Sequence, residues 1–505
     1  MAIHEKVLIT RKGKMDMSSI LSFIWYSFFD RAAMFMTVLV FVGQLFAKRG
    51  FVESLSGGLK AYIGYVVYQT ATGGLYTIFQ PIMMGLRQVL GMNIIVNDDS
   101  LGAGTLTHIL ESFGRTTSLQ MAAMAVGFAI ACLLVIFKKY TKFRSIIIQA
   151  HILSGQAIDM VPIMLVMYPK MNDAVTIVVV GLYLAVKWCM LSNLTVEPAQ
   201  DLTDGANMVV GHAQMIVDRI AYEYGKHVEK KAKKAGKEVK KFDNIELPGF
   251  LSIFNDMYVA SFIVMLIYFS VLMALIGKQN MMAIDPSLGA NDSFALYIFH
   301  SAGKFPVYLV ILLTGMRMFV AELTVAFSGI SEKVLPDVLP GIDCAAFYGF
   351  VTDGQVVTIS FIVGSLSMTL FTFLGMLAGL PFVCIVGFVP MMFDSATAGI
   401  FGYQRGGVKG LVFGVELCAI SDVFLAGIAA CIIGFNVYGG VGFQVDNAIT
   451  LAAFSPIWKY LGWAGYVLVI AIMLAIPQIQ YSLNKKGYWL ASEDWEKYKE
   501  VMSEE

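Results

Sequence analysis

Long hydrophobic stretches follow one another along the chain and predict helices that cross a membrane. A spanning helix needs about 20 largely apolar residues, because the hydrocarbon core is about 30 Å thick and each helical residue rises about 1.5 Å. A first apolar core, Ala32 to Ala47, is followed by Lys48-Arg49 and not by a cleavage site, so we expect it to remain as a span. Further uninterrupted segments are 118–138, 174–192, 256–277, 305–328, 355–378, 411–436 and 459–481.

Four other apolar segments are interrupted by glycine, proline or ionisable residues: 58–84, 144–168, 203–222 and 380–402. Irregular backbone is tolerated at membrane depth only where protein or a water-filled cavity satisfies the freed polar groups. In transporters, such broken segments mark the substrate site. The pattern predicts an all-α polytopic membrane protein with about 10–11 transmembrane helices plus re-entrant hairpins. Residues 17–29 are expected to form an interfacial helix.

Polar segments divide the chain. Residues 1–16 form a polar N-terminal segment, 482–505 form a polar tail, and 17–481 form the membrane domain. Eight lysines gather in the loop 223–246, which the positive-inside rule places in the cytoplasm. This loop is either a solvated linker or a surface for anionic lipid or an acidic partner. It separates a first half, 17–222, from a second half, 247–481, and the similar order of their segments suggests inverted repeats.

Composition excludes several classes of protein. Of the 505 residues, 57% are hydrophobic and only 14% are charged, against about 25% in soluble domains. These values exclude disorder and argue against an ordinary water-soluble enzyme. The 36 basic residues balance 36 acidic ones, so no net cationic field attracts nucleic acid. The six cysteines have no paired spacing, which indicates small buried side chains and not disulfides or a zinc site.

Ionisable and amide side chains inside the broken segments are the candidate site, because such groups are costly in a membrane. Imidazoles, amides and a carboxylate together suit a polyhydroxylated ligand, whereas their spacing does not predict a metal site. The candidates are His151, Ser154, Gly155, Gln156, His212, Gln214 and Asp343.

Other ionisable residues in apolar segments are interpreted as structural. Arg317 and Glu322 are expected to pair with each other or to anchor a helix end. The same interpretation applies to Asp159, Lys187, Asp394, Glu416 and Asp422. Neither a phosphate-binding P-loop nor a nucleophilic serine elbow occurs in the sequence, so direct use of ATP is not predicted.

Several motifs resemble one family over roughly residues 20 to 480. They are EPAQDLTDG at 197–205 with GHAQ at 211–214, LPGFLSIFNDM at 247–257, GMRMFVAELTVAFSGISEKVLP at 315–336 with GIDCAA at 341–346, and FVPMMFDSATAGIFGYQRGG at 388–407. The chain is similar to the membrane-embedded enzyme IIC component, or permease, of the ascorbate-specific phosphotransferase system, in the ascorbate/galactitol superfamily.

This resemblance implies a homodimeric sugar permease in the bacterial cytoplasmic membrane. It implies a core domain, a V-shaped dimerisation domain, two inverted repeats with re-entrant hairpins, and an elevator-type movement of the core. Separate IIB and IIA components would supply the phosphoryl group. No phosphoryl-transfer residue, cofactor or metal is expected on this chain.

The resemblance also carries binding residues across. His151, His212 and Asp343 match the family's binding residues. Asp99 and Ser100 fall in its binding stretch, where the ascorbate carrier has a threonine and an aromatic hydroxyl. Gly155-Gln156 replaces Gln-Gln, and Ala213 replaces the glutamine after the second histidine, with Gln214 retained. Lost polar partners change ligand discrimination strongly, so the expected substrate is ascorbate or a related sugar acid or polyol.

Two other functions remain open from the sequence. An ion-coupled secondary transporter of a sugar acid would use Asp343 or Asp159 as its coupling carboxylate. An integral-membrane enzyme or sensor would use the histidines for chemistry. Uptake without phosphoenolpyruvate would select the first of these, and a product formed by the purified chain alone would select the second.

Overall fold

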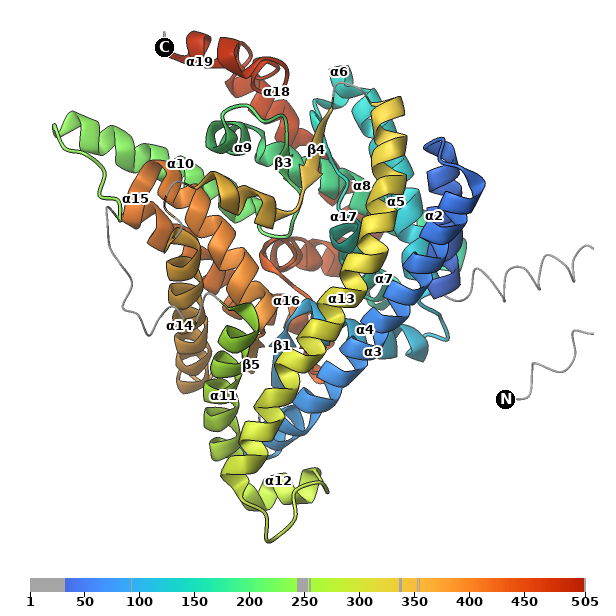
Figure 1. Ribbon diagram of the computed structural model, residues 1–505, viewed down its shortest axis with the longest axis vertical. Coiled ribbons are helices and arrows are strands. Elements are labelled where there is room, and N and C mark those ends of the chain that lie inside the picture. Colours follow the sequence, from blue (N-terminus) through green and yellow to red (C-terminus); the bar gives the residue numbers. More distant parts are fainter. Residues whose placement is uncertain are drawn as a thin grey trace, which may run out of the picture.

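Figure 1 shows the computed structural model, which describes residues 32–91, 93–242, 253, 256–335, 338–351, 353 and 355–503. The predicted interfacial helix at 17–29 and the polar segment 1–16 lie outside these residues, and so does the side chain of Ser100.

Helices make up most of the described chain, as the hydrophobic pattern predicts. In the first half they are α2 (Ala32–Phe46), α3 (Phe51–Leu90), α4 (Asp99–Ser112), α5 (Ser118–Ile136), α6 (Lys138–Thr141), α7 (Ala150–Met167), α8 (Asp173–Leu194), α9 (Val196–Thr203) and α10 (Met215–Lys234). In the second half they are α11 (Met257–Ile276), α12 (Lys278–Ile284), α13 (Phe294–Val334), α14 (Gln355–Leu377), α15 (Ser395–Ile420), α16 (Ala426–Ile433), α17 (Val445–Leu483), α18 (Leu490–Glu493) and α19 (Trp495–Ser503). Short 3₁₀ or π segments are η3 (Cys344–Phe350), η4 (Pro390–Asp394), η5 (Ser421–Leu425) and η6 (Phe435–Val437).

Eight helices among the described residues are long and apolar enough to cross a membrane. They include all seven uninterrupted segments predicted between 118 and 481, so a multi-pass membrane protein is confirmed. The number is lower than the expected 10–11, partly because the predicted segments 380–402 and 411–436 fall in one apolar run, Pro390–Ile433. That run kinks at Gly407, whose φ of 55° is in the left-handed region that glycine adopts without strain.

The segment 58–84, predicted to be broken, is part of one continuous helix, α3, despite Pro81 inside it. Helices α3 and α13 run side by side along the molecule (Figure 1). Their backbones touch where two glycines meet. A Cβ on Gly64 would lie 2.6 Å from the backbone nitrogen of Phe319, and a Cβ on Gly315 would lie 2.5 Å from that of Tyr68. Small residues permit such close helix contacts in membranes.

Two three-stranded parallel sheets, which the sequence analysis did not predict, lie among the helices. One has the order β5 (Phe382–Val386), β1 (Asn93–Asn97), β6 (Gly440–Val441), and the other has the order β2 (Ser145–Ile147), β4 (Leu339–Ile342), β3 (Val209–Val210). The strands are short, and apolar runs of this length cannot be told from helix segments by periodicity. Buried backbone groups must be paired, and the strands pair those of the broken segments with one another.

The two halves of the chain exchange their central strands. Strand β1, from the first half, lies between β5 and β6 of the second half, with Ile95 opposite Cys384. Strand β4, from the second half, lies between β2 and β3 of the first half, with Ile146 opposite Pro340. Each sheet therefore needs both halves of the chain.

The C-terminal tail packs against the start of β2. The guanidinium of Arg144 is fully buried, lies 3.7 Å from the ring centroid of Tyr488 and donates to Glu197 Oε1 at 3.1 Å. Glu197 Oε2 accepts a second bond from Arg219 at 2.6 Å. In Figure 1, α18 and α19 lie at the top of the molecule, while α10, which carries several lysines of the predicted loop, projects at the left.

The cysteines follow the prediction. All six are free, and five of them are buried.

Candidate functional site

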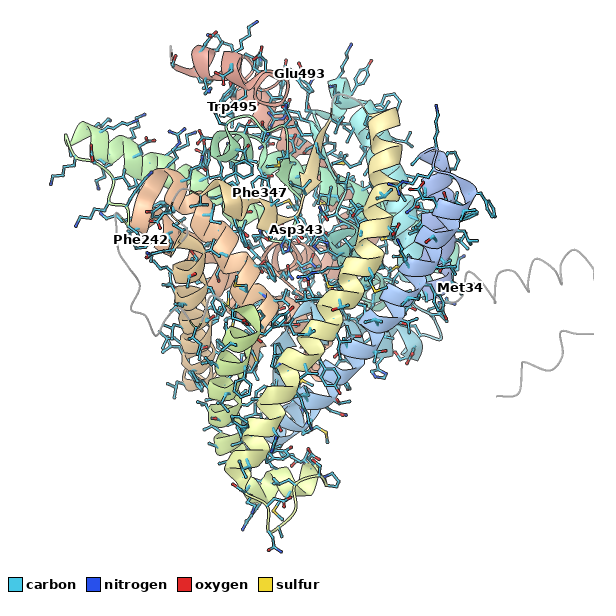
Figure 2. The ribbon with its side chains drawn as sticks, viewed as in Figure 1. Met34, Phe242, Asp343, Phe347, Glu493 and Trp495 are labelled. Atoms are coloured by element: carbon cyan, nitrogen blue, oxygen red, sulfur yellow. The ribbon has the colours of Figure 1, made fainter. Side chains whose placement is uncertain are left out.

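A cavity of about 340 Å³ is lined by residues that follow the carboxyl ends of strands from both sheets. Asp343 follows β4 and is labelled near the middle of the view in Figure 2. Eight of the ten predicted site residues line the cavity: Asp99, His151, Ser154, Gly155, Gln156, His212, Ala213 and Asp343. Residues that are far apart in the chain meet here because parallel strands end on the same edge of a sheet.

The sheet that contains β4 supplies an imidazole–carboxylate pair. His151 Nε2 lies 3.1 Å from Asp343 Oδ2, and Asp343 Oδ1 caps η3 by accepting from the backbone N–H of Ala345 at 2.9 Å. Burial alone would raise the pKa of Asp343, but the hydrogen bond and the charge of His151 hold that pKa below its usual range. The carboxylate is therefore ionised and accepts hydrogen bonds at the cavity wall.

His212 is held by a residue behind it. Its ring centroid lies 6.0 Å from that of His151, and its Nδ1 lies 2.6 Å from Gln214 Oε1. The same amide oxygen accepts from the N–H of Ala213, so it also acts as an acceptor toward His212. The imidazole therefore donates through Nδ1, and its Nε2 points away from Gln214. Gln214, a predicted site residue, is fully buried and does not line the cavity. Gln214 therefore contacts His212 from behind the cavity wall.

Tight backbone contacts bring these histidines and Asp343 together. A Cβ on Gly211 would lie 2.6 Å from the carbonyl carbon of Gly341, so β3 and β4 approach closely only because both positions are glycine. Gly211 directly precedes His212, and Gly341 lies two residues before Asp343.

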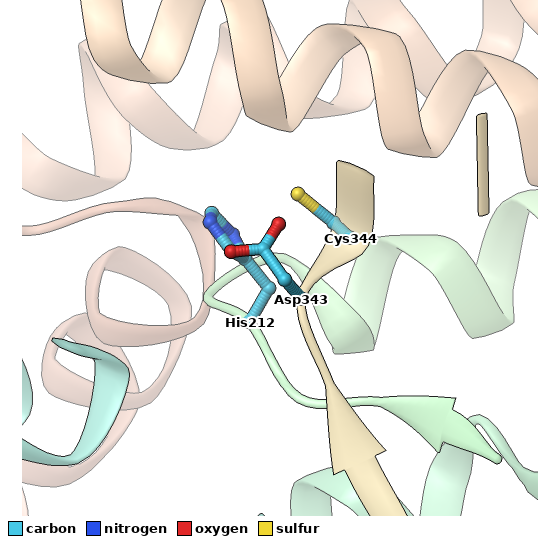
Figure 3. A group of neighbouring side chains, drawn as sticks. All are labelled: His212, Asp343 and Cys344. Carbon is cyan, nitrogen blue, oxygen red and sulfur yellow. The ribbon is translucent and has the colours of Figure 1, made fainter. Parts of the chain in front are cut away.

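His212, Asp343 and Cys344 form a group that the sequence spacing did not predict (Figure 3). Their possible ligand atoms lie within 4.8 Å of one another. The Cys344 thiol is fully buried and lies 3.7 Å from the Tyr348 hydroxyl. Burial, together with the charge of Asp343, raises the pKa of this thiol well above its usual value. The thiol is therefore protonated and can donate to or accept from its neighbours.

The first two turns of α7 leave room in the cavity. Gln156 Oε1 accepts from Trp188 Nε1 at 3.1 Å, and the Ser154 hydroxyl bonds back to the carbonyl of His151 at 3.1 Å. No atom lies within 4 Å of the position that a Cβ on Gly155 would occupy. A larger side chain would fit there without a clash.

The other sheet adds Asp159, Gln444 and Asn447 beside the predicted Asp99, and the sequence analysis named neither of the two amides. Asp99 accepts a hydrogen bond from Gln444, which follows β6. Asp159, interpreted as structural from the sequence, lines the cavity and accepts from Asn447 at 2.7 Å. A signal was present in the sequence, because Val441-Gly442 precedes Gln444 much as Val210-Gly211 precedes His212.

The predicted pairing of Arg317 with Glu322 is wrong. Glu322 instead accepts from Gln44 at 2.8 Å and pairs with Lys60 at 3.2 Å. Arg317 lines the cavity from α13, and it is the one lysine or arginine among the described lining residues. The rest of that wall is largely apolar and is formed by Leu312, Leu313, Met316, Phe319 and Val320.

A polytopic helical membrane protein with a polar cavity built on broken, strand-containing segments belongs to the class of membrane permeases. Residues 27–448 match the family described as PTS system sugar-specific permease component. The chain belongs to this family, whose type (EIIC-GAT) is the ascorbate/galactitol enzyme IIC.

The chain is also similar to a protein of Mycoplasma pneumoniae (strain ATCC 29342 / M129) named ascorbate-specific PTS system EIIC component. The two are 27% identical over 440 residues, which cover 78% of this chain. The match spans 65% of the length of that relative, slightly under two thirds.

Proposed function

We propose that this chain translocates ascorbate, or a related sugar acid or polyol, as the permease subunit of a phosphoenolpyruvate-dependent phosphotransferase system. The observation that carries this proposal is the cavity itself. It presents carboxylate, imidazole and amide groups from five or more separate segments to a space of sugar size, about 340 Å³. These groups both accept and donate hydrogen bonds, as the hydroxyl groups of a sugar require.

Translocation by an elevator-type movement is part of the proposal. The cavity lies between α13 and the elements that carry the two sheets. The α13 wall is largely apolar, and such a surface makes no directional hydrogen bonds that would have to break as the sheet-bearing core slides past it. Figure 1 shows how α13 extends along the molecule, which would give the core a long surface for this movement.

Two inverted repeats, a core domain and a V-shaped dimerisation domain are also proposed. The exchange of central strands supports the repeats: β1 lies between β5 and β6 as β4 lies between β3 and β2. The acidic residues also correspond, because Asp99 follows β1 and Asp343 follows β4. The working unit is proposed to be a homodimer in the bacterial cytoplasmic membrane.

The phosphoryl group is proposed to come from separate IIA and IIB proteins. On this proposal, IIB phosphorylates the sugar at the cytoplasmic opening, and this chain binds and orients the sugar without a covalent step. The lysine-rich segment 223–246 is a candidate contact for such a partner, since its described part on α10 carries exposed lysines.

The test is uptake of radiolabelled ascorbate and galactitol into vesicles that contain the chain. We expect uptake only when phosphoenolpyruvate and the IIA and IIB components are supplied, with phosphorylated sugar inside. Uptake that proceeds without them and collapses when the proton or sodium gradient is dissipated would replace the proposal with ion-coupled transport. A chemically altered product made by the purified chain alone would instead indicate an enzyme.

A further inference from the structure

The side of the cavity next to the sheet β5-β1-β6 carries two carboxylates that are held in the same way. Asp99 Oδ2 accepts from the side-chain amide of Gln444, and Asp159 Oδ2 accepts from the side-chain amide of Asn447 at 2.7 Å. Both amides come from the segment that follows β6. One oxygen of each carboxylate is thereby fixed in place.

The second oxygens converge on Gly442. The position that a Cβ on Gly442 would occupy lies 2.8 Å from Asp159 Oδ1 and 3.0 Å from Asp99 Oδ1. The backbone of Gly442 does not have a positive φ, so glycine is required here for the space and not for the conformation. No hydrogen bond joins either Oδ1 to a donor among the described residues. The two Oδ1 atoms therefore lie together beside Gly442, and all three residues line the cavity.

A buried cation stands behind Asp159. Lys187 is fully buried, and its ammonium group contacts Asn447 Oδ1, while the amide nitrogen of the same Asn447 donates to Asp159. Asp159 is only 5% exposed, so its carboxyl group needs such a hydrogen-bonded partner. The amide of Asn447 joins the ammonium group of Lys187 to that carboxyl group and leaves Asp159 Oδ1 to accept from a ligand.

We propose that Asp99 Oδ1 and Asp159 Oδ1 form a hydroxyl-binding subsite, and that Lys187 acts through Asn447 to position Asp159 as an acceptor. The subsite takes two neighbouring hydroxyl groups from the uncharged end of the sugar, because carboxyl oxygens accept hydrogen bonds from hydroxyl groups and offer no cation to an anionic group. The acidic end of a sugar acid then lies toward Arg317, the one lysine or arginine among the described lining residues. This inference rests on the proposed function, since it assumes a sugar in the cavity.

The test compares two ligands on the purified full-length chain. L-Ascorbate has a vicinal diol on its side chain, remote from its acidic enediol, and 5,6-dideoxy-L-ascorbate lacks that diol. We expect the native chain to bind ascorbate at least about tenfold more tightly, since hydrogen bonds to charged groups have that effect. Asp159→Asn and Asp99→Asn should each weaken ascorbate binding and shrink the difference between the ligands severalfold.

Lys187→Met tests the positioning role. It leaves both carboxylates in the cavity wall, yet it should shrink the preference for ascorbate over the dideoxy compound as Asp159→Asn does. If Lys187 had only a structural role, Lys187→Met would weaken the binding of both ligands equally.

Asp422→Asn is the matched control. Asp422 is a fully buried carboxylate that does not line the cavity, so this variant should keep the native preference. Thermal unfolding of every variant identifies those that fail to fold. If Asp159→Asn is unstable, Asp99→Asn provides the test, because Asp99 is less buried.

Three results would overturn the inference. The first is an undiminished preference for ascorbate in both aspartate variants. The second is a loss of ascorbate binding when choline replaces sodium, because the carboxylates would then hold a cation in place of hydroxyl groups. The third is a native chain that binds neither ascorbate nor galactitol, which would remove the proposed function and this inference with it. In the first two results the native chain still binds sugar, so the proposed function survives.

Discussion

The Nε2 atom of His151 lies 3.1 Å from Oδ2 of Asp343, although the two residues belong to opposite halves of the chain. The contact joins the start of α7 to the end of β4. It forms because β2, which precedes His151, pairs with β4. The contact between His151 and Asp343 therefore depends on the correct pairing of β2 with β4.

Asp343→Asn is expected to weaken sugar binding about tenfold or more, because it removes a charged acceptor of hydrogen bonds while keeping the size of the side chain. Equilibrium binding of ascorbate and galactitol to the purified variant measures the effect. Asp292→Asn is the control, since Asp292 bonds to the N–H of Gly289 in an exposed loop. Equal affinities for the native chain and Asp343→Asn would remove Asp343 from the binding site.

Arg317→Gln is expected to distinguish charged from neutral sugars. As the one permanent cation among the described lining residues, Arg317 should favour anionic ascorbate by about fivefold, the scale of a partly exposed ion pair. Galactitol binding should not change, and the ascorbate effect should diminish at high salt. Lys60→Gln, which removes a cation outside the cavity, is the control. An equal loss for both sugars would show that Arg317 acts through packing and not through charge.

Gly64→Val is expected to destabilise the contact between α3 and α13. The added side chain would meet the backbone of Gly315 and Phe319 within 2.7 Å, and overpacking of this kind costs about 1–3 kcal/mol or more. Thermal unfolding in detergent gives the comparison. Gly73→Ala on the same helix has nothing within 4 Å and should be neutral or slightly stabilising. A native melting temperature for Gly64→Val would contradict the close helix contact.

Glu197 is expected to make stability depend on acidity. Burial would raise the pKa of Glu197, but Arg144 and Arg219 lower it from 4.5 to about 2. A carboxyl whose pKa is lower in the folded state stabilises the protein above its unfolded pKa, and this contribution is lost as the pH falls from about 4.5 toward 2. The melting temperature of the native chain should fall across that window.

Glu197→Gln should remove this part of the pH dependence and should lower stability at neutral pH by about 3 kcal/mol, as breaking a buried pair does. Glu223→Gln provides the comparison, because Glu223 bonds the same Arg219 at 2.8 Å from a more exposed position. If Glu197→Gln and the native chain lost stability in parallel below pH 4.5, another group would be responsible.

Much of the fold could be predicted because membrane helices are long and apolar. Segments such as 355–378 satisfy a length rule that needs no tertiary information. The strands could not be predicted, since Val209–Val210 becomes a strand only by pairing with Gly341 and Ile342, which lie far along the chain. The continuity of α3 through Pro81 was missed for a similar reason: neighbouring helices can support a proline that sequence rules treat as a break.

The candidate site could be predicted in part. His151, His212 and Asp343 stand out because ionisable groups are costly in broken apolar segments, and their mutual proximity required the sheet. Asp159 and Arg317 are equally costly to place in apolar segments. Whether they reach the cavity depends on which face of their helix lines it. The sequence of these helices has no clear amphipathic pattern that would identify that face. The supporting role of Gln214, which lies behind His212, follows only from coordinates.

The exchange of central strands sets an order of events during biosynthesis. Strand β1 leaves the ribosome long before β5 and β6, its sheet partners among the described residues, so its strand pairing can form only after most of the chain has been made. Long-range pairing of this kind is slow and exposes the nascent chain to aggregation. A truncated first half would lack the partners of all three of its strands, because β1 pairs with β5 and β6, and β2 and β3 pair with β4. Neither sheet can therefore form until both halves of the chain have been synthesised.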